Sequence, residues 1–388
     1  MRPQITKPTR SSPRQQRGAA LLILLTLVVL AAGYTLLKRL NQTPSDLSRA
    51  GDTAVVLGEA KAALMGFALS SQVRPGVLPC PDNTANGGDG NSALTCTGAG
   101  NVTFRLPWKT LGLPDLRDSS GERLWYAVDP LFSGAAGINS DTLATQTIDG
   151  GATRYVAVII APGKSLPGQS RSGSQQNNIL RYLEGDNANN DTVFVTAAAG
   201  NFNDQIIGIT RDELMQVVER RVLKEVSDSL NTYFSENNYF PNPAPAGLSI
   251  CDSTIFAGMV PTTINNVNCI SQTEWDVPPT AADLPAWFQP NNWNQVIWYV
   301  VSTDCVEGAS NCIVTNLVTI NDPPNTSNVQ AVLIAGGAAL AGLSQNNRSP
   351  ITSDNDLLDS GENRDDDAVF EILPIDTTSN DQIQVVAP

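Results

Sequence analysis

Oxygen-bearing side chains that could hold a metal ion gather in one loop between two cysteines. Asp82, Asp89 and Asn91 lie in a Gly- and Asn-rich stretch between Cys80 and Cys96. Ca²⁺ takes about 6–8 oxygen ligands from such groups. The spacing does not follow the EF-hand pattern, so two interpretations stay open. The loop is either a calcium site on Asp82, Asp89 and Asn91 or a plain polar loop.

The chain of 388 residues contains no histidine. This excludes Ser-His-Asp and Cys-His nucleophile systems and His-ligated zinc sites. No G-x-S-x-G, P-loop or G-x-G-x-x-G motif stands at a strand–helix junction. We therefore expect a protein that is not an enzyme and has no cofactor apart from the calcium just considered. A carboxylate-based envelope hydrolase is the enzymatic alternative.

The charge distribution argues against a nucleic-acid partner. The net charge is −14, although residues 1–17 carry five basic and no acidic side chains. The rest of the chain is therefore strongly acidic and repels phosphate backbones. We expect no nucleic-acid binding.

Six cysteines follow the N-terminal region, and their even number predicts disulfides if the protein is exported. Six cysteines allow many connectivities, of which nearest-neighbour pairing is the simplest. No C-x-x-C motif occurs, which argues against a metal–thiolate site. The pairs expected from nearest-neighbour pairing are Cys80–Cys96, Cys251–Cys269 and Cys305–Cys312.

An uncharged apolar run extends over 18–37, between Arg17 and Lys38. About 20 helical residues span the ~30 Å hydrocarbon core of a bilayer. The basic residues before the run predict a cytoplasmic N-terminus. We expect a membrane helix over 19–40, with the remaining chain across the membrane. A plain signal anchor and a cleaved secretory signal are the two simple interpretations.

A third interpretation comes from residues 17–22 (R-G-A-A-L-L), which resemble the signal of type IV pilins and type II secretion pseudopilins. In that family a prepilin peptidase cuts after the glycine and keeps the apolar helix. The resemblance implies a cleaved basic leader over 1–18 and a processing site at Gly18 and Ala19. Most pilins carry Glu at the fifth mature position. This chain has Ile23 there, which favours a minor or K-type-like subunit.

Three motifs further along extend the resemblance to bacterial prepilin-type proteins. They are L-P-C-P at 78–81, L-P-W-K-T-L-G at 106–112 and R-L-W-Y at 123–126, in this order after a helix. In that group the Pro-Trp turn looks structural. The resemblance covers 17–128 and implies no catalytic residue.

The remaining pattern predicts a helix followed by strands. Leu57, Ala60, Leu64 and Phe67 form one apolar stripe in a helix over 46–71. Strands are predicted over 123–128, 155–160 and 191–196 from their β-branched and aromatic residues.

The same order then recurs, which indicates an internal duplication with its joint near 200–211. Thr210 and Glu213 have capping-box spacing at the start of a helix to about 235, with Glu213 reaching back to the cap. Trp-Tyr strands at 125–126 and 298–299 and later motifs repeat at offsets of 173–176. Because Trp125 and Trp298 are repeat equivalents, we expect them in the core rather than on a carbohydrate- or partner-binding surface.

The sequence thus predicts an α+β fold: an N-terminal transmembrane helix continuing into a long helix, then two tandem pilin-like units of helix packed on antiparallel sheet. The units are expected over 41–207 and 208–388. The expected function is a minor pilin or pseudopilin-like subunit of a type IV pilus or type II secretion pseudopilus, at its tip.

The expected partners are other pilin or pseudopilin subunits through the N-terminal helix, the prepilin peptidase and the bacterial inner membrane. The N-terminus is expected in the cytoplasm, and the ectodomain in the periplasm or on the surface after assembly. The alternative is a singly anchored periplasmic binding or scaffold protein unrelated to pili.

Overall fold

The computed structural model describes residues 50–387, except 86, 97–101, 135–136, 266, 270–271, 276–282, 309–311, 313–317, 322–325, 341–344, 346–347, 349–350 and 366–368. The predicted leader (1–18) and membrane helix (19–40) lie outside the described residues. The chain divides into two compact units, residues 1–55 and 56–388. We call residues 56–210 and 211–388 the first and the second half of the larger unit.

The first described element is the helix Ala50–Ser70, inside the segment predicted as helical. In the described part of the chain, this one helix is long and apolar enough to cross a membrane, judged by length and composition. Its inner face nevertheless belongs to the protein core. The buried residues are Leu57, Ala60, Leu64 and Ala68. Phe67, predicted as the fourth residue of the stripe, is only partly buried, because Ala68, one turn after Leu64, takes the inward position.

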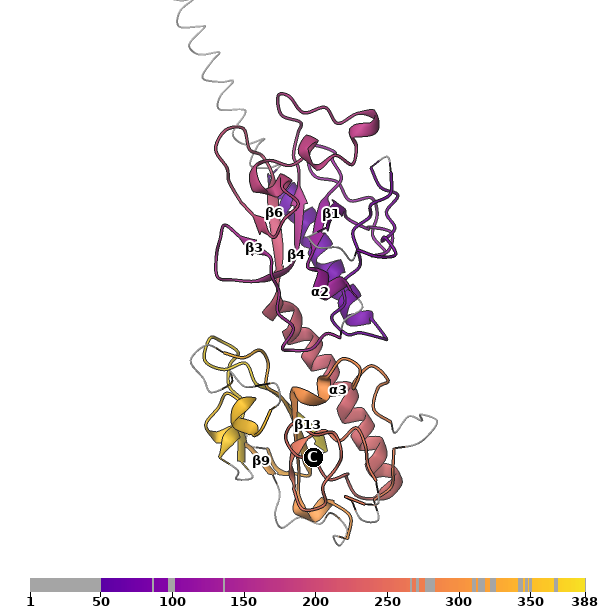
Figure 1. Cartoon of the computed structure of the whole chain (residues 1–388). Coiled ribbons are helices and arrows are strands. Elements are labelled where there is room, and N and C mark those ends of the chain that lie inside the picture. The colour runs from indigo at the N-terminus through magenta and orange to yellow at the C-terminus, as the bar shows by residue number, and fades with distance from the viewer. Residues whose placement is uncertain are drawn as a thin grey trace, which may run out of the picture. The chain divides into compact units, whose positions relative to one another are not determined.

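Four antiparallel strands form the main sheet of the first half (Figure 1). They are β1 (Val102–Arg105), β2 (Trp125–Val128), β4 (Tyr155–Ala161) and β6 (Gln205–Thr210), in the order β1-β2-β4-β6. The strands predicted over 123–128 and 155–160 are thus confirmed as β2 and β4. β6 occupies the expected joint between repeats, so the boundary predicted at 207/208 falls inside a strand.

The main sheet of the second half also has four antiparallel strands. They are β7 (Ala257–Met259), β8 (Ile297–Val301), β11 (Ala331–Ala335) and β13 (Gln382–Ala387), and β7-β8-β11-β13 is their order along the sheet. The long helix α3 (Arg211–Asn237) precedes this sheet in the sequence and packs on β11 and β13. Each half therefore places one long helix before four strands that have the same spatial order.

The central strands of the two sheets also pair in the same register. Trp125 lies opposite Ile160 in the first sheet, and Trp298 lies opposite Ile334 in the second. Corresponding residues are 173 or 174 positions apart, which is the offset of the sequence motifs.

A buried tyrosine in each central strand fastens the proline-bracketed segment that precedes the sheet. The Tyr126 hydroxyl donates a hydrogen bond to the Pro79 carbonyl oxygen at 3.1 Å. The Tyr299 hydroxyl donates to the Pro241 carbonyl oxygen, also at 3.1 Å. Burial raises the pKa of both phenols, so they remain neutral donors. The two segments therefore occupy equivalent places.

Two smaller sheets contain parallel pairs. β3 (Thr147–Ile148) pairs with β5 (Val193–Phe194), and β9 (Val318–Asn321) lies between β10 (Thr326–Val329) and β12 (Val369–Glu371). The strand predicted over 191–196 is thus shorter than expected and lies outside the main sheet. The reason is that β4 already pairs with β2 on one side and β6 on the other.

Short helical turns complete the described elements. α2 (Pro130–Ser133) follows β2, and its N-cap Asp129 accepts a hydrogen bond from the Leu131 amide. The 3₁₀ helices are Gly173–Gln175, Ile179–Arg181, Gly185–Ala188, Trp293–Gln295, Thr303–Cys305, Asp354–Asp356 and Glu362–Arg364.

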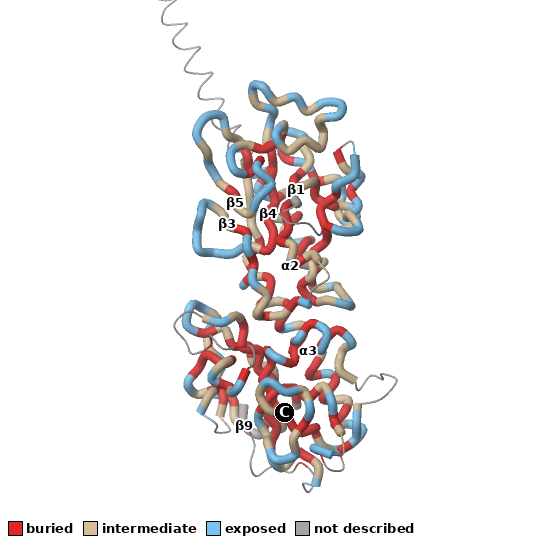
Figure 2. Tube along the Cα trace, in the orientation of Figure 1, coloured by how far each residue is buried: buried red, intermediate tan, exposed pale blue. Residues whose placement is uncertain are grey.

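Both faces of the first main sheet are buried, as the red tube along β4 shows (Figure 2). Tyr126 belongs to the core that includes the helix Ala50–Ser70. Its neighbour Trp125 points to the opposite face, where it packs with Tyr182 and Phe194 from the long loop between β4 and β6. The ring centroids of Trp125 and Tyr182 are 5.4 Å apart. A helix therefore covers one face of the sheet, and a loop covers the other.

α3 begins where the capping-box spacing predicts. The Thr210 hydroxyl accepts a hydrogen bond from the Glu213 amide at 3.1 Å. The prediction that Glu213 reaches back to the cap is wrong, because its carboxylate pairs with the ammonium group of Lys61 at 2.7 Å. A full positive charge attracts a carboxylate more strongly than a backbone amide does. This ion pair ties the helix Ala50–Ser70 to the start of α3.

Three disulfides are present, and they are the nearest-neighbour pairs Cys80–Cys96, Cys251–Cys269 and Cys305–Cys312. They join residues 16, 18 and 7 positions apart. Each disulfide restricts the unfolded chain, which is worth about 2–4 kcal/mol for loops of this size. All three staple loops rather than strands of the main sheets.

Replacing Tyr126 or Tyr299 by Phe should lower the free energy of unfolding by about 1 kcal/mol, because each change leaves a buried carbonyl without its donor. Urea unfolding of the full-length protein measures the effect. Tyr239→Phe is the matched control, since that hydroxyl lies at the surface beside Thr273. Equal losses in all three variants would contradict the structural role of the two buried phenols.

Candidate functional site

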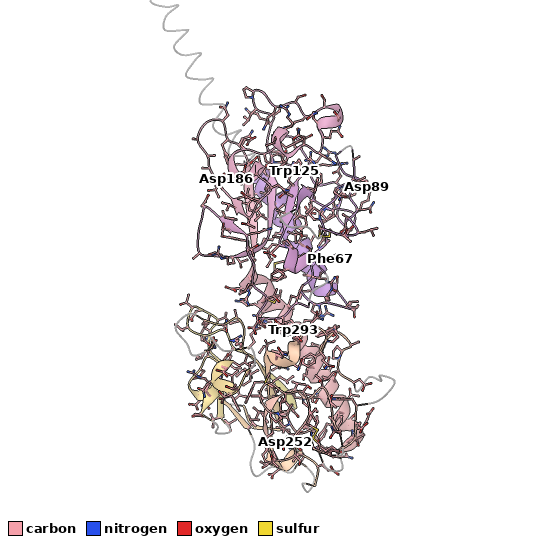
Figure 3. The ribbon with its side chains drawn as sticks, viewed as in Figure 1. Phe67, Asp89, Trp125, Asp186, Asp252 and Trp293 are labelled. Atoms are coloured by element: carbon pink, nitrogen blue, oxygen red, sulfur yellow. A yellow bond between two sulfur atoms is a disulfide. The ribbon has the colours of Figure 1, made fainter. Side chains whose placement is uncertain are left out.

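In the loop predicted to hold calcium, the carboxylates accept hydrogen bonds from the loop's own backbone amides. Asp82 is buried and accepts hydrogen bonds from the amides of Thr84 (2.9 Å) and Gly90 (2.6 Å). Asp89 lies in an outer loop (Figure 3), and the Asn91 amide, 2.9 Å away, lowers its pKa. In the described ranges, no three Cys, Asp or Glu side chains are grouped to hold a metal. These contacts fit a polar loop, and calcium binding stays a prediction.

The other predicted site residues divide into those inside and those outside the described chain. The processing site, Gly18 and Ala19, lies outside it. The six cysteines are all paired. Trp125 is fully buried (Figure 3) and Trp298 is 7 % exposed. Both belong to the core, as the repeat equivalence predicts.

One arginine closes the long loop between β4 and β6. The Arg171 guanidinium donates hydrogen bonds to the carbonyl oxygens of Gly163 (2.6 Å), Arg181 (3.0 Å) and Tyr182 (3.2 Å). A guanidinium has five N–H donors and no acceptor. One side chain can therefore satisfy carbonyl groups at the start and the middle of a loop whose backbone has few strand partners.

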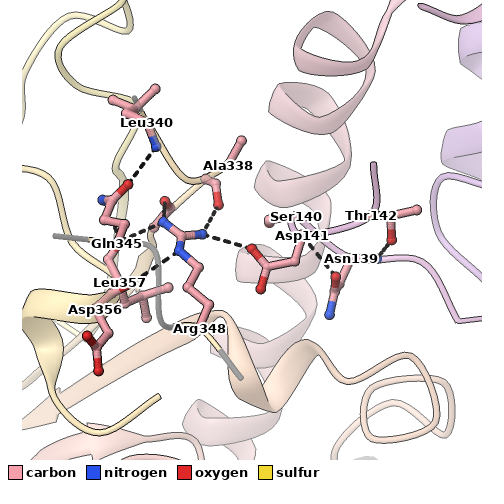
Figure 4. Close-up of polar contacts among 12 residues, drawn as sticks. Asn139, Ser140, Asp141, Thr142, Ala338, Leu340, Gln345, Arg348, Asp356 and Leu357 are labelled. Carbon is pink, nitrogen blue, oxygen red and sulfur yellow. Dashed lines mark hydrogen bonds and ion pairs between the residues drawn. The ribbon is translucent and has the colours of Figure 1, made fainter. Parts of the chain in front are cut away.

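Arg348 does the same in the loop between β11 and β13 (Figure 4). It donates to the carbonyl oxygens of Gly337 (2.6 Å), Asp356 (3.2 Å) and Leu357 (2.9 Å). These acceptors lie 174 or 175 residues after those of the first half. Arg348 is itself buried and also pairs with Asp141 of the first half at 3.0 Å. The second arginine thus joins the two halves as well as closing its loop.

In each of these two loops, a glutamine side chain near the arginine donates a hydrogen bond to a carboxylate. The side-chain amide of Gln169 donates to the Glu184 carboxylate at 2.7 Å. In the second half, the side-chain amide of Gln345 donates to the Asp359 carboxylate. The acid is one methylene shorter in the second half, yet its partner is the same. The glutamine–carboxylate hydrogen bond is therefore present in both loops, although the acidic side chains differ in length.

A buried aspartate and an asparagine complete the network in each half. Asp204 accepts a hydrogen bond from the Asn187 side chain at 3.0 Å, and Asp381 accepts one from Asn363 at 3.1 Å. Each asparagine side-chain oxygen also accepts a hydrogen bond from a backbone amide at 2.8 Å. The donor is the Val195 amide, just after β5, in the first half and the Glu371 amide, at the end of β12, in the second. The network thus connects the loop, the small sheet and the start of β6 or β13.

Burial of the two aspartates changes their acidity. Burial, together with the nearby Asp359 carboxylate, raises the pKa of Asp381 to about 6. Burial also raises the pKa of Asp204. Raised carboxyl pKa values are one requirement of acid–base catalysis. Here, however, the carboxylates accept hydrogen bonds from loop groups, so the arrangement supports anchoring of the loops.

A buried carboxylate also joins the two halves. Glu219 of α3 accepts a hydrogen bond from the Ser140 hydroxyl of the first half at 2.6 Å and another from the Gln382 side chain of β13. Burial raises the pKa of Glu219 to about 7, although Arg211 and Arg348 oppose the shift. The Glu219 carboxyl group is therefore a pH-sensitive contact between the two halves.

No sequence prediction covers this network, although two signals for it exist. The tetrapeptide Asn-Asp-Gln-Ile occurs at 203–206 and again at 380–383. Gly-acid-Asn occurs at 185–187 and at 361–363. The arginines are harder to align, because Gln169 and Arg171 are two positions apart whereas Gln345 and Arg348 are three apart.

The arrangement as a whole holds distant segments of one chain together. The arginine clusters close the loops, and Glu219 and Asp141 join the halves. Comparison with known proteins gives no match to a family model, a curated protein or a solved structure.

Replacing Glu219 by Gln should remove a pH dependence of stability. The folded pKa of about 7 exceeds the ordinary glutamate value of 4.5. The contribution of Glu219 is thus fully present below the unfolded pKa and is lost as the pH rises through about 7. Gln keeps hydrogen-bonding capacity toward Ser140 and Gln382 but carries no charge.

We therefore expect the free energy of unfolding of the unmodified protein to fall relative to the variant, by up to a few kcal/mol, between about pH 5 and 8. Urea unfolding at several pH values measures this difference. Glu236→Gln, near the exposed end of α3, is the control. A difference that is independent of pH contradicts the role assigned to Glu219.

Proposed function

We propose that this chain is a non-enzymatic, membrane-anchored structural subunit of the type IV pilin and type II secretion pseudopilin class. One observation carries the proposal. The helix Ala50–Ser70 follows the apolar segment 19–40 in the sequence and buries one face in a core that contains an antiparallel sheet. The resemblance at residues 17–22 implies this arrangement: an apolar helix at the N-terminus, continuing into a helix packed on a sheet.

In this proposal the N-terminus is cytoplasmic and the segment 19–40 spans the bacterial inner membrane. The head lies in the periplasm, or on the surface after assembly. Three disulfides fit an oxidising compartment of this kind. The prepilin peptidase is the first partner, and other pilin or pseudopilin subunits are the next. Helix packing against those subunits replaces the lipid contacts of the segment.

We further propose that the head consists of two tandem pilin-like units, over 41–207 and 208–388. The common strand order, the common register of β2 with β4 and β8 with β11, and the paired arginine clusters support this proposal. A doubled head is bulky to repeat along a fibre, and Ile23 stands where most pilins carry Glu. Both features favour a minor subunit at the tip.

The rival function is a singly anchored periplasmic binding or scaffold protein that keeps its basic N-terminal segment. Processing separates the two. We expect mass spectrometry of the mature protein to show Ala19 as the first residue, and Gly18→Leu to leave the longer, unprocessed form.

The matched control is Gly33→Leu, which makes the same change inside the apolar segment and should leave cleavage intact. A mature protein that begins at Met1, or at any residue other than Ala19, contradicts the pilin proposal. The head structure stays as described under either outcome.

A further inference from the structure

A pocket of about 330 Å³ in the first half has a lining unlike the rest of this acidic chain. Small-molecule sites usually have volumes of about 300–1,000 Å³, so the pocket can admit a small ligand. Four arginines contribute to its wall, from β1, from the turn before β2 and from the loop after β4. The lining residues are Gly87, Arg105, Arg117, Glu122, Arg123, Arg171, Gln176 and Tyr182.

The charges around the pocket do not cancel. Asp115 pairs with both Arg117 (2.7 Å) and Arg123 (2.8 Å), and Glu122 pairs with Arg171 (3.2 Å). Two carboxylates thus face four guanidinium groups, which leaves two positive charges in a chain whose net charge is −14. A local field of this sign attracts small anions and concentrates them at the pocket.

Arg105 is the least compensated of the four. Its side chain is only 3 % exposed, and its Cζ atom lies 4.1 Å from the ring centroids of both Trp125 and Tyr182. Two of its nitrogens donate to the carbonyl oxygens of Arg123 (3.0 Å) and Gln176 (2.6 Å). Its Nε atom is buried without a hydrogen-bond partner.

Within the described residues, no carboxylate lies within ion-pair distance of Arg105. Burial lowers the pKa of its guanidinium to about 10, which reflects the cost of holding this charge away from water. An unpaired buried charge is unfavourable, whereas charge-assisted hydrogen bonds to an oxyanion offset that cost. The ligand that suits this pocket is therefore an anion.

The other arginines are held in place before any ligand arrives. Arg123 donates to both Asp115 oxygens and to the carbonyl oxygens of Gly87 and Gly88. Arg171 is fixed by its loop carbonyls, as described above. Arg117, at the rim, has the most exposed side chain of the four (46 %), and it donates hydrogen bonds to the Gly121 carbonyl oxygen (2.8 Å) and to Asp115 (2.7 Å). A preorganised wall of this kind suits a small ligand.

We propose that this pocket binds a small polar molecule through an oxyanion, a carboxylate or a phosphate, with Arg105 and Arg117 as its principal cationic contacts. A guanidinium matches the planar geometry of both anions. Tyr182 supplies an aromatic wall, and Gln176 supplies an amide that suits hydroxyl groups. An acidic or phosphorylated sugar has this combination of groups. The proposal is independent of the pilin assignment.

The pocket distinguishes the first half from the second. Arg105 of β1 lies opposite Trp125, whereas the position opposite Trp298 on β7 holds Met259. Met259 is an uncharged core residue. The second sheet therefore lacks the central cation, and we assign ligand binding to the first half alone.

Calorimetric titration of the full-length protein in detergent micelles, at low ionic strength, tests the proposal. Galacturonate supplies a carboxylate, glucose-6-phosphate supplies a phosphate, and galactose is the neutral control. We expect binding of at least one of the two anions, with an affinity that falls as NaCl is added, and no binding of galactose. Whichever anion binds identifies the oxyanion. The absence of heat with both anions, or equal binding of galactose, overturns the proposal.

Four variants locate the site. Arg117→Gln and Arg105→Lys should each weaken anion binding by about tenfold, since each removes a guanidinium contact. Glu122→Gln should strengthen binding several-fold, because it removes a competing carboxylate, and a folding defect cannot produce such a gain. Lys224→Gln, an equal charge change on the exposed face of α3, should have no effect. If Glu122→Gln and Arg117→Gln both bind like the unmodified protein, the ligand does not occupy this pocket.

Discussion

The need to bury both faces of the first main sheet governs much of this structure. The helix Ala50–Ser70 covers one face, and the long loop between β4 and β6 covers the other. Such a loop has buried carbonyl groups that no strand partner reaches, and they must be satisfied by side chains. Arg171 supplies the donors in this loop, and Arg348 supplies them in the equivalent loop of the second half.

This solution explains why so many polar groups are buried in a protein with so apolar a core. A loop that is fixed by side chains needs acceptors and donors in matching numbers, so the arginine comes with a glutamine, an acid and an asparagine. The carboxyl groups of Asp204 and Asp381 are buried as a consequence, and their pKa values rise. In the first half the same loop supplies Arg171 and Tyr182 to the arginine-lined pocket. The anchoring network and the proposed binding site are thus parts of one structure.

Local patterns were enough to predict the helix Ala50–Ser70, α3, β2, β4 and the nearest-neighbour disulfides, because each depends on short spacings. β6 and β13 are not predicted. β6 lies at the joint that the sequence suggests between the repeats, and only pairing with β4 and β11 makes the two segments strands. The partner of Glu213 is not predicted either, because Lys61 lies 152 positions away in the sequence.

Local sequence patterns do not predict the polar network or the arginine-lined pocket, for a related reason. Arg105 looks like an ordinary strand residue in the sequence, and its position between two aromatic rings depends on the fold. Arg171 and Arg348 lie in loops of unequal spacing, which hides their equivalence. The repeated Asn-Asp-Gln-Ile segment is the clearest signal, and it marks the start of β6 and of β13.

Hydrogen exchange of the full-length Arg171→Lys variant, followed by mass spectrometry, tests most directly whether one arginine holds the covering loop. Lys keeps the charge but cannot reach several carbonyl groups at once. We expect faster exchange over 163–184, with β2 and β4 still protected, and no such change in the control Arg154→Lys, which replaces an exposed arginine just before β4. Unchanged exchange over 163–184 would contradict the account.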